Sequence, residues 1–483
     1  MRSDLVSALP LALDAQQAMP IPTQLTAQIR QLIAEQVLSP GDHIPSTRAL
    51  AKQLGVSRGS VVTAYDQLAA EGYIVTAHGS GTTINPSLHL LKPKELDTAD
   101  TPREEAPANP FHLNLDPGVP DTSTLINSEW RAAWREASSN PPAHRPAQGL
   151  PALRVEIAEH LRRMRGLIAD PSRIIVTAGA REGLTLLLRT FDGSARIGVE
   201  SPGYPSLRRA PQVLGHHIAD LPTDAEGLVV DNLPTDLDAV LITPSHQYPY
   251  GGSLPAARRT ELVNWAEHTD TLLIEDDFDS ELRYVGMPLP PLTALAAERT
   301  ILLGTFSSVI SPHISCGYLV APSALATQMT ELRGVLGQPV SAITQSAVAN
   351  FLDSGALRRR TQRLRRVYRR RRATVQRVFD DIDDAELRPI KGGLHAVVIC
   401  QRPADDVVAE LDGRGISVTA LSQYWGGSSG AENGIVFGFG SHDDDTLDWA
   451  LAEISDAIQV QIHTPQTGLL LYLHHSHSNT LER

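Results

Sequence analysis

Short apolar runs alternate with helical stretches from Phe111 to about residue 320, and this alternation constrains the fold more than any other feature. A mostly parallel sheet covered by helices produces such a pattern, because each strand returns to the sheet through a helix. The predicted strands are Ile174–Thr177, Ile197–Glu200, Ala239–Thr243, Thr271–Glu275 and Thr300–Leu303. Helices from residue 321 and short strands around Gly393–Cys400 and Gly434–Phe439 predict a smaller α+β part.

The chain has 483 residues, which is too long for one ordinary core, so we expect at least two domains. Residues 1–85 contain short helical segments and a glycine-rich strand pair. Residues 86–110 are rich in Pro, Asp and Glu, which is typical of a linker. The α/β domain follows over 111–463, with its large part ending at about residue 320. The polar tail 464–483, with His474, His475 and His477, is predicted to be disordered and not to bind metal.

The N-terminal domain has the pattern of a DNA-binding helix-turn-helix with a wing. Two helices, Ser46–Leu54 and Ser57–Ala70, are separated by Gly55-Val56, and a hairpin with a Gly79-Ser80-Gly81 tip follows. Residues 1–85 carry 5 basic and 6 acidic groups, so the prediction depends on the order of the elements and not on charge. The candidate contact residues at the exposed start of the second helix are Ser57, Arg58, Ser60 and Thr63.

Polar side chains follow four predicted strands of the second domain. A turn at Ala178-Gly179-Ala180 leads into a helix, whose free N–H groups favour an anion. The other loops carry Tyr204, the stretch 243–252, the carboxylates of 274–284, and a group made of Thr305, Ser307 and Ser308. Because the carboxyl ends of parallel strands meet at one edge, these loops predict a ligand crevice there.

The segment PGDHIPSTRALAKQLGVSRGSVVTAYDQLAAEGYIVTAHGSGT resembles the winged helix of the GntR family of bacterial regulators. Residues 111–455 resemble the fold-type-I, class I/II aminotransferase domain of its MocR/GabR branch. The resemblance implies that Arg48 and Arg58 reach phosphates or guanine edges, that Ser60 lies in the major groove, and that His78 and Gly79 touch the minor groove or backbone. It also implies pyridoxal 5′-phosphate as cofactor, effector sensing, and a head-to-tail homodimer.

Several cofactor positions depart from the family pattern. Where the family has Ser-Lys this chain has Ser307-Ser308, and the family's phosphate-binding arginine corresponds to Ser315. Phe278 replaces a tyrosine, and Tyr250 stands where a small Thr or Ser is usual. A Schiff base needs an amine, which a serine hydroxyl cannot supply.

Lysine is scarce in this chain. The four lysines are Lys52, Lys92, Lys94 and Lys391, and only Lys391 follows residue 111. It precedes a strand of the smaller part, which is not the imine position of the resembling fold. Covalent attachment of pyridoxal phosphate is therefore not expected.

Part of the cofactor site survives. Asp276 is retained, where it would pair with the pyridinium nitrogen, and Arg181 replaces an expected glutamine. Arg181 either supplies the positive charge missing at Ser315 or is a solvated arginine at the helix start. The expected remnant site consists of Gly179, Ala180, Arg181, Tyr204, Asp276, Thr305, Ser307 and Ser308. From this remnant site we expect pyridoxal phosphate to bind only non-covalently, or no cofactor to bind.

These features predict a transcription regulator whose aminotransferase-like module senses an effector and dimerises, with no catalytic residue and no metal. The alternatives are a constitutive DNA-binding dimer with a ligand-free scaffold, and a working aminotransferase. The expected partners are double-stranded operator DNA, a second copy of the chain and a small-molecule effector. Two cysteines, Cys316 and Cys400, and no long apolar run indicate a bacterial cytoplasmic protein, nucleoid-associated when bound to DNA, with no membrane partner.

Ten arginines lie between Arg358 and Arg372. They form either a second nucleic-acid surface or a helix whose arginines pair with the acidic excess of a chain of net charge −13.

Overall fold

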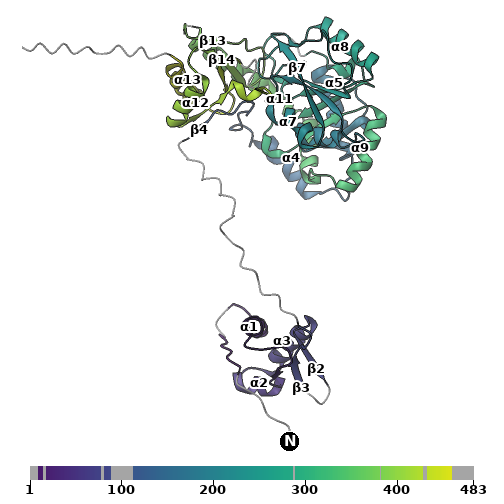
Figure 1. Cartoon of the computed structure of the whole chain (residues 1–483), viewed down its shortest axis with the longest axis vertical. Helices are drawn as coiled ribbons and strands as arrows, with labels where there is room; N and C mark the ends of the chain where they lie inside the picture. The colour runs from purple at the N-terminus through teal and green to yellow at the C-terminus, as the bar shows by residue number, and fades with distance from the viewer. Residues whose placement is uncertain are drawn as a thin grey trace, which may run out of the picture. The chain divides into compact units, whose positions relative to one another are not determined.

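The computed structural model describes residues 9–14, 18–77, 81–88, 112–286, 289–380, 382–427 and 432–459. The chain forms two compact units, Met1–Pro107 and Ala108–Arg483 (Figure 1). The predicted linker 86–110 and tail 464–483 lie almost entirely outside the described residues.

The N-terminal unit is a winged helix. Its helices are α1 (Ile21–Ala34), α2 (Thr47–Leu54) and α3 (Arg58–Ala70). The strands β1 (His43–Ile44), β2 (Ile74–Ala77) and β3 (Gly81–Ile84) form an antiparallel sheet in the order β1-β3-β2. The Ser46 side chain caps the start of α2, and Gly55, at φ +66°, ends it in a conformation that glycine adopts without strain. The predicted helices and hairpin are therefore confirmed.

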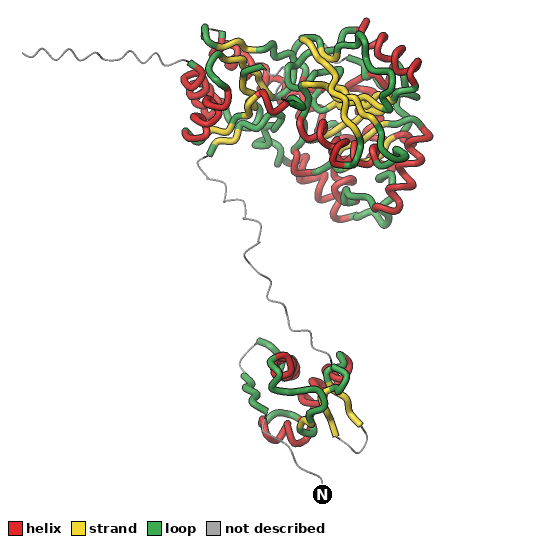
Figure 2. Tube along the Cα trace, in the orientation of Figure 1, coloured by secondary structure: helices red, strands yellow, loops and turns green. Residues whose placement is uncertain are grey.

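The second unit contains an eight-stranded sheet in the order β5-β12-β11-β10-β9-β6-β7-β8 (Figure 2). Its strands are β5 (Ile174–Thr177), β6 (Arg196–Ser201), β7 (His217–Asp224), β8 (Gly227–Leu228), β9 (Ala239–Ile242), β10 (Leu272–Asp277), β11 (Thr300–Thr305) and β12 (Gly317–Val320). All five predicted strands are present. The pattern did not predict β12, which runs antiparallel between β5 and β11, or the β7–β8 pair.

Helices cover both faces of this sheet. Along β9, Ala239 and Leu241 pack in one apolar cluster with α6 (Ala180–Leu188) and α7 (Pro205–Val213), whereas Val240 and Ile242 pack in another with α8 (Ala256–Thr269). Burial on both faces explains why the strands are continuous apolar runs without alternation. The helices of the second unit that precede residue 354 are α4 (Ser128–Ser139), α5 (Pro151–Arg165), α6 (Ala180–Leu188), α7 (Pro205–Val213), α8 (Ala256–Thr269), α9 (Ser323–Leu336) and α10 (Ala342–Asp353).

The smaller part has its own antiparallel sheet, in the order β13-β14-β17-β16. Its strands are β13 (Ala385–Leu387), β14 (His395–Cys400), β16 (Thr419–Ala420) and β17 (Gly434–Gly438), and its helices are α11 (Ala356–Phe379), α12 (Ala404–Gly413) and α13 (Asp444–Ile458). A separate pair joins β4 (Leu113–Asn114) to β15 (Ile416–Ser417). Helices α9 and α10 contact α4, α5, α6 and β5, so the chain just after residue 320 packs with the large sheet.

The arginine-rich segment is part of helix α11. Arg360 is 2% exposed and donates to the backbone oxygens of Val309 (2.9 Å) and Asp121 (2.6 Å). Arg371, also buried, donates to Asp444 (2.9 Å). Some arginines of this helix thus pair with acidic and carbonyl groups, whereas the second nucleic-acid surface stays an untested prediction for its exposed arginines.

Among the described residues, no helix has the length and apolar character to cross a membrane, and no group of three or more His, Cys, Asp or Glu side chains is arranged to hold a metal. The histidines of the tail lie outside the described residues.

Candidate DNA-binding surface and effector crevice

The exposed start of α3 carries the predicted DNA contacts. Arg58 opens this helix and Arg48 lies in the first turn of α2, and both side chains are exposed. Neither guanidinium has a hydrogen-bond or ion-pair partner among the described residues. Two exposed arginines with unused forked donors, one on α2 and one at the start of α3, suit phosphate or guanine contacts. His78 and Gly79, predicted to touch DNA from the wing, lie outside the described residues.

The three hydroxyl groups predicted at this surface have local partners. The Ser57 hydroxyl accepts a hydrogen bond from the Ser60 backbone N–H (3.1 Å) and lies 2.8 Å from the Ser60 hydroxyl. Thr63 donates to the Gly59 carbonyl (3.1 Å). The Ser57 side chain therefore caps the N-terminus of α3. The cap fixes the backbone at the start of this helix, where Arg58 lies.

The predicted crevice is a cavity of 230 Å³ at the carboxyl edge of the large sheet. We call it the Asp276 crevice. Six of the eight residues of the expected remnant site line it: Arg181, Tyr204, Asp276, Thr305, Ser307 and Ser308. The other two, Gly179 and Ala180, lie at the start of α6 behind Thr305, where a Cβ on Gly179 would stand 4.0 Å from the Thr305 hydroxyl.

Asp276 at the end of β10 gives the crevice its electrostatic character. The carboxyl group is 4% exposed, and its Oδ1 has no hydrogen-bond partner among the described residues. Burial raises the pKa of Asp276 well above its usual value, and the nearby carboxylates of Asp277 and Asp279 raise it further. Burying the ionised carboxylate of Asp276 costs free energy, and a cationic group placed against it would lower that cost. The protonated nitrogen of a pyridine ring is such a group.

Another group of side chains in the lining suits an anion. The hydroxyls of Thr305 and Ser307 lie 2.8 Å apart, next to the N-terminus of α6. Arg181, in the first turn of this helix, is exposed and lines the cavity, and its guanidinium has no partner among the described residues. Ser315, which the sequence resemblance matches to the family's arginine, is exposed and does not line the cavity. The two hydroxyls, the N-terminus of α6 and a single arginine are therefore the groups that fit a phosphate here.

No amine lines the crevice among the described residues. Ser308 is 6% exposed, and its hydroxyl donates to the Phe278 carbonyl (2.6 Å). Lys391 lines two other cavities and not this one. The residues present therefore fit a phosphorylated pyridine held non-covalently, and they do not fit its covalent attachment.

An aromatic wall narrows the crevice, and the sequence did not reveal it. Tyr248 packs edge to face against Tyr204 (5.2 Å between ring centroids) and against Phe278 (5.5 Å). His246 stacks on Phe278, and its Nδ1 is hydrogen-bonded to the Asp279 carboxylate (2.8 Å). The loop TPSHQYPYGG was predicted to face the crevice, but which of its side chains does so depends on the path of the loop after β9.

Comparisons with known proteins agree with this geometry. Residues 22–84 match the bacterial regulatory proteins of the gntR family, and residues 112–424 match aminotransferase class I and II. The chain is 68% identical over 456 residues to the HTH-type pyridoxine biosynthesis transcriptional regulator PdxR of Corynebacterium glutamicum, which covers 94% of this chain and 100% of that protein. It is 29% identical to the probable rhizopine catabolism regulatory protein MocR of Rhizobium meliloti, over 90% of this chain and 93% of the relative.

The second unit also resembles solved structures. The crystal structure of an archaeal alanine:glyoxylate aminotransferase superposes with a TM-score of 0.67 at 22% identity, over 72% of this chain and 90% of that one. At this identity the likeness shows the fold alone. The resemblance seen in the sequence is thereby confirmed for both units.

Proposed function

The chain belongs to the GntR family of bacterial regulators, in the MocR-type branch that joins a winged helix-turn-helix to an aminotransferase-like domain, and from this premise we propose that its second unit senses a small-molecule effector without covalent attachment or turnover. One observation carries the proposal: Ser308, which the sequence resemblance matches to the attachment lysine, lines the crevice, and no described amine does so.

The chain's own residues would hold pyridoxal 5′-phosphate as a ligand. Asp276 would face the ring nitrogen, and Thr305, Ser307, Arg181 and the start of α6 would face the phosphate. When bound, the cofactor supplies an aldehyde and an electron-withdrawing ring. With a hydroxyl at Ser308, the crevice has neither a lysine to bind that aldehyde nor a base of the usual kind.

Regulation would then be a coupling free energy between the crevice and the DNA-binding unit. The C. glutamicum relative is named for pyridoxine biosynthesis, which supports genes of that kind as the target and a pyridoxal compound as the effector. In line with the family, we propose that the chain acts on operator DNA as a head-to-tail homodimer in the cytoplasm.

The size of the crevice favours a second candidate, a constitutive DNA-binding dimer with a scaffold domain. Its 230 Å³ is below the roughly 300–1,000 Å³ of most small-molecule sites, since Tyr248 and Phe278 occupy one side.

A titration with pyridoxal phosphate separates the candidates. The full-length protein is titrated, treated with borohydride and examined by mass spectrometry of its peptides. Saturable binding without a reduced adduct is the expected result. A stoichiometric adduct on Lys391 would overturn non-covalent sensing, and absence of binding by a protein that still binds DNA would favour the scaffold.

A further inference from the structure

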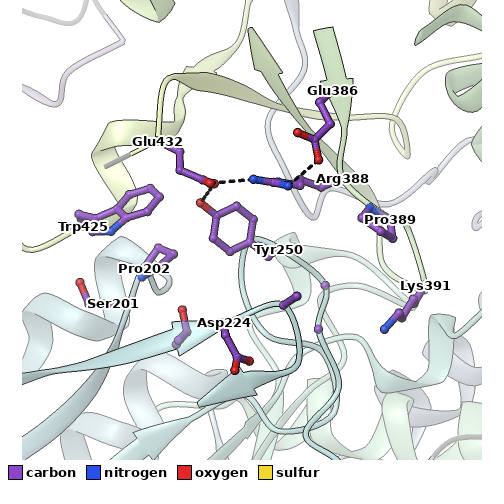
Figure 3. Close-up of a pocket in the computed structure, with 14 residues that line it drawn as sticks. Ser201, Pro202, Asp224, Tyr250, Glu386, Arg388, Pro389, Lys391, Trp425 and Glu432 are labelled. Atoms are coloured by element: carbon purple, nitrogen blue, oxygen red, sulfur yellow. Dashed lines mark hydrogen bonds and ion pairs between the residues drawn. The ribbon is translucent and has the colours of Figure 1, made fainter. Parts of the chain in front are cut away.

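A second and larger cavity of 510 Å³ lies between the large sheet and the smaller one (Figure 3). We call it the inter-sheet pocket. From the large sheet it is lined by the ends of β6 and β7 and by residues 250–252. From the smaller part it is lined by Glu386, Arg388, Pro389, Lys391, Trp425 and Glu432. It shares no lining residue with the Asp276 crevice. The predicted effector site does not account for it.

One wall of this pocket is a fixed aromatic surface. The Tyr250 hydroxyl donates to Glu432, whose other oxygen accepts from Arg388 (2.7 Å). The Arg388 guanidinium lies 5.7 Å from the centre of the Tyr250 ring, and the Trp425 ring packs edge-on against Tyr250 at 6.1 Å. These contacts hold the Tyr250 ring in one orientation and give a flat ligand a surface to stack on. Tyr250 is also the position where the family usually has a small residue.

The carboxylates that line the pocket already have cationic partners. Arg258 binds Asp224 through two hydrogen bonds of 2.8 and 2.6 Å, and Arg388 binds both Glu386 (2.6 Å) and Glu432. A cationic ligand would have to displace these arginines. The pocket therefore does not select for a cation.

A cationic donor in the pocket lining remains unused. The Lys391 ammonium has no hydrogen-bond or ion-pair partner in the described part of the chain, and it lies across the cavity from Trp425 in Figure 3. An unpaired ammonium in a partly enclosed site attracts an anion.

We propose that the inter-sheet pocket binds a small monocarboxylate with a flat, apolar body. Lys391 would bind the carboxylate, and Tyr250 and Trp425 would contact the flat body. A single negative charge fits better than a phosphate dianion, because Asp224, Glu386 and Glu432 all lie in the same lining and would repel the second charge.

Calorimetric titration of the full-length protein with benzoate tests this assignment. We expect saturable binding of one benzoate per chain, and binding of the uncharged isostere benzamide that is weaker by about tenfold or more. Lys391→Met should weaken benzoate by a similar factor, whereas Lys391→Arg should retain it. Lys52→Met, which removes an exposed lysine of α2, is the matched control and should change nothing. Tyr250→Thr should also weaken benzoate, and the folding of this variant can be checked by its circular dichroism and its thermal unfolding.

Three results would overturn the proposal: equal affinity for benzoate and benzamide, unchanged affinity in Lys391→Met, or tighter binding of phenyl phosphate than of benzoate. Arg181→Ala, which alters the other cavity, should leave benzoate binding intact. Failure here is thus distinguishable from failure of the proposed effector site, which is probed with pyridoxal phosphate.

Discussion

Replacing Arg181 tests how the crevice holds a phosphate. Arg181 is the only arginine among the described residues that line it, and it stands at the start of α6, whose N-terminus already favours an anion. A hydrogen bond from a charged group contributes about 1.5–3 kcal/mol, but exposed ion pairs contribute less because solvent screens them. Since Arg181 is exposed, we expect Arg181→Ala to weaken pyridoxal phosphate by about 1–2 kcal/mol, or roughly fivefold to thirtyfold in Kd.

The assay is a calorimetric or fluorescence titration with pyridoxal phosphate and, in parallel, with pyridoxal, which lacks the phosphate. Arg181→Ala should lower affinity for the first ligand only. Arg189→Ala is the matched control, because Arg189 is an exposed arginine at the opposite end of the same helix. If Arg181→Ala weakened both ligands alike, or neither, Arg181 would be a solvated arginine and the phosphate assignment would be wrong.

Other predictions concern the attachment position, a buried acid and the DNA surface. Ser308→Lys should give a borohydride-stable pyridoxal phosphate adduct on the peptide that contains residue 308, where the parent gives none; equal labelling of both proteins in the mass spectrum would contradict the role of this position. Burial raises the pKa of Glu200 from 4.5 to about 7, so the folded protein keeps a proton that the unfolded chain releases. Stability should therefore fall as pH rises from about 4.5 to 7, by about 3 kcal/mol from this group, and Glu200→Gln should flatten that part of the urea-midpoint curve; an unchanged slope would refute the assignment. Arg58→Ala should weaken operator binding and lower the slope of log K against log salt by about 1 in an anisotropy titration. Arg30→Ala, whose guanidinium is held by Glu71, should leave that slope unchanged, and equal losses would place Arg58 outside the DNA surface.

The winged helix could be predicted because its signals are local. Ser57 caps α3, and Gly55 ends α2, within a few residues of the elements they bound. The central strands could also be predicted from the sequence, because burial on both faces makes each of them a continuous apolar run. The boundaries of β5 agree with the prediction to the residue.

The topology and the inner wall of the crevice could not be predicted in this way. Strand β12 lies antiparallel between β5 and β11, and its four-residue sequence gives no indication of its neighbours or direction. Tyr248 reaches the crevice only because the loop after β9 turns towards Phe278. Arg360 appeared in the sequence as one of ten similar arginines, yet its burial depends on carbonyls that are far away in the chain, such as that of Asp121.

The two cavities share one short segment of backbone, and this gives a physical route between them. Tyr248 lines the Asp276 crevice and Tyr250 lines the inter-sheet pocket, while the Pro249 carbonyl between them accepts a hydrogen bond from His395 of the smaller part (2.9 Å). A ligand stacked on Tyr250 therefore acts on the wall that limits the size of the crevice. Linkage requires that the effect be reciprocal. Saturating benzoate should change the affinity for pyridoxal phosphate by the same factor as saturating pyridoxal phosphate changes the affinity for benzoate. If both ligands bind and neither affinity changes, segment 248–250 is a rigid partition and the two sites are independent.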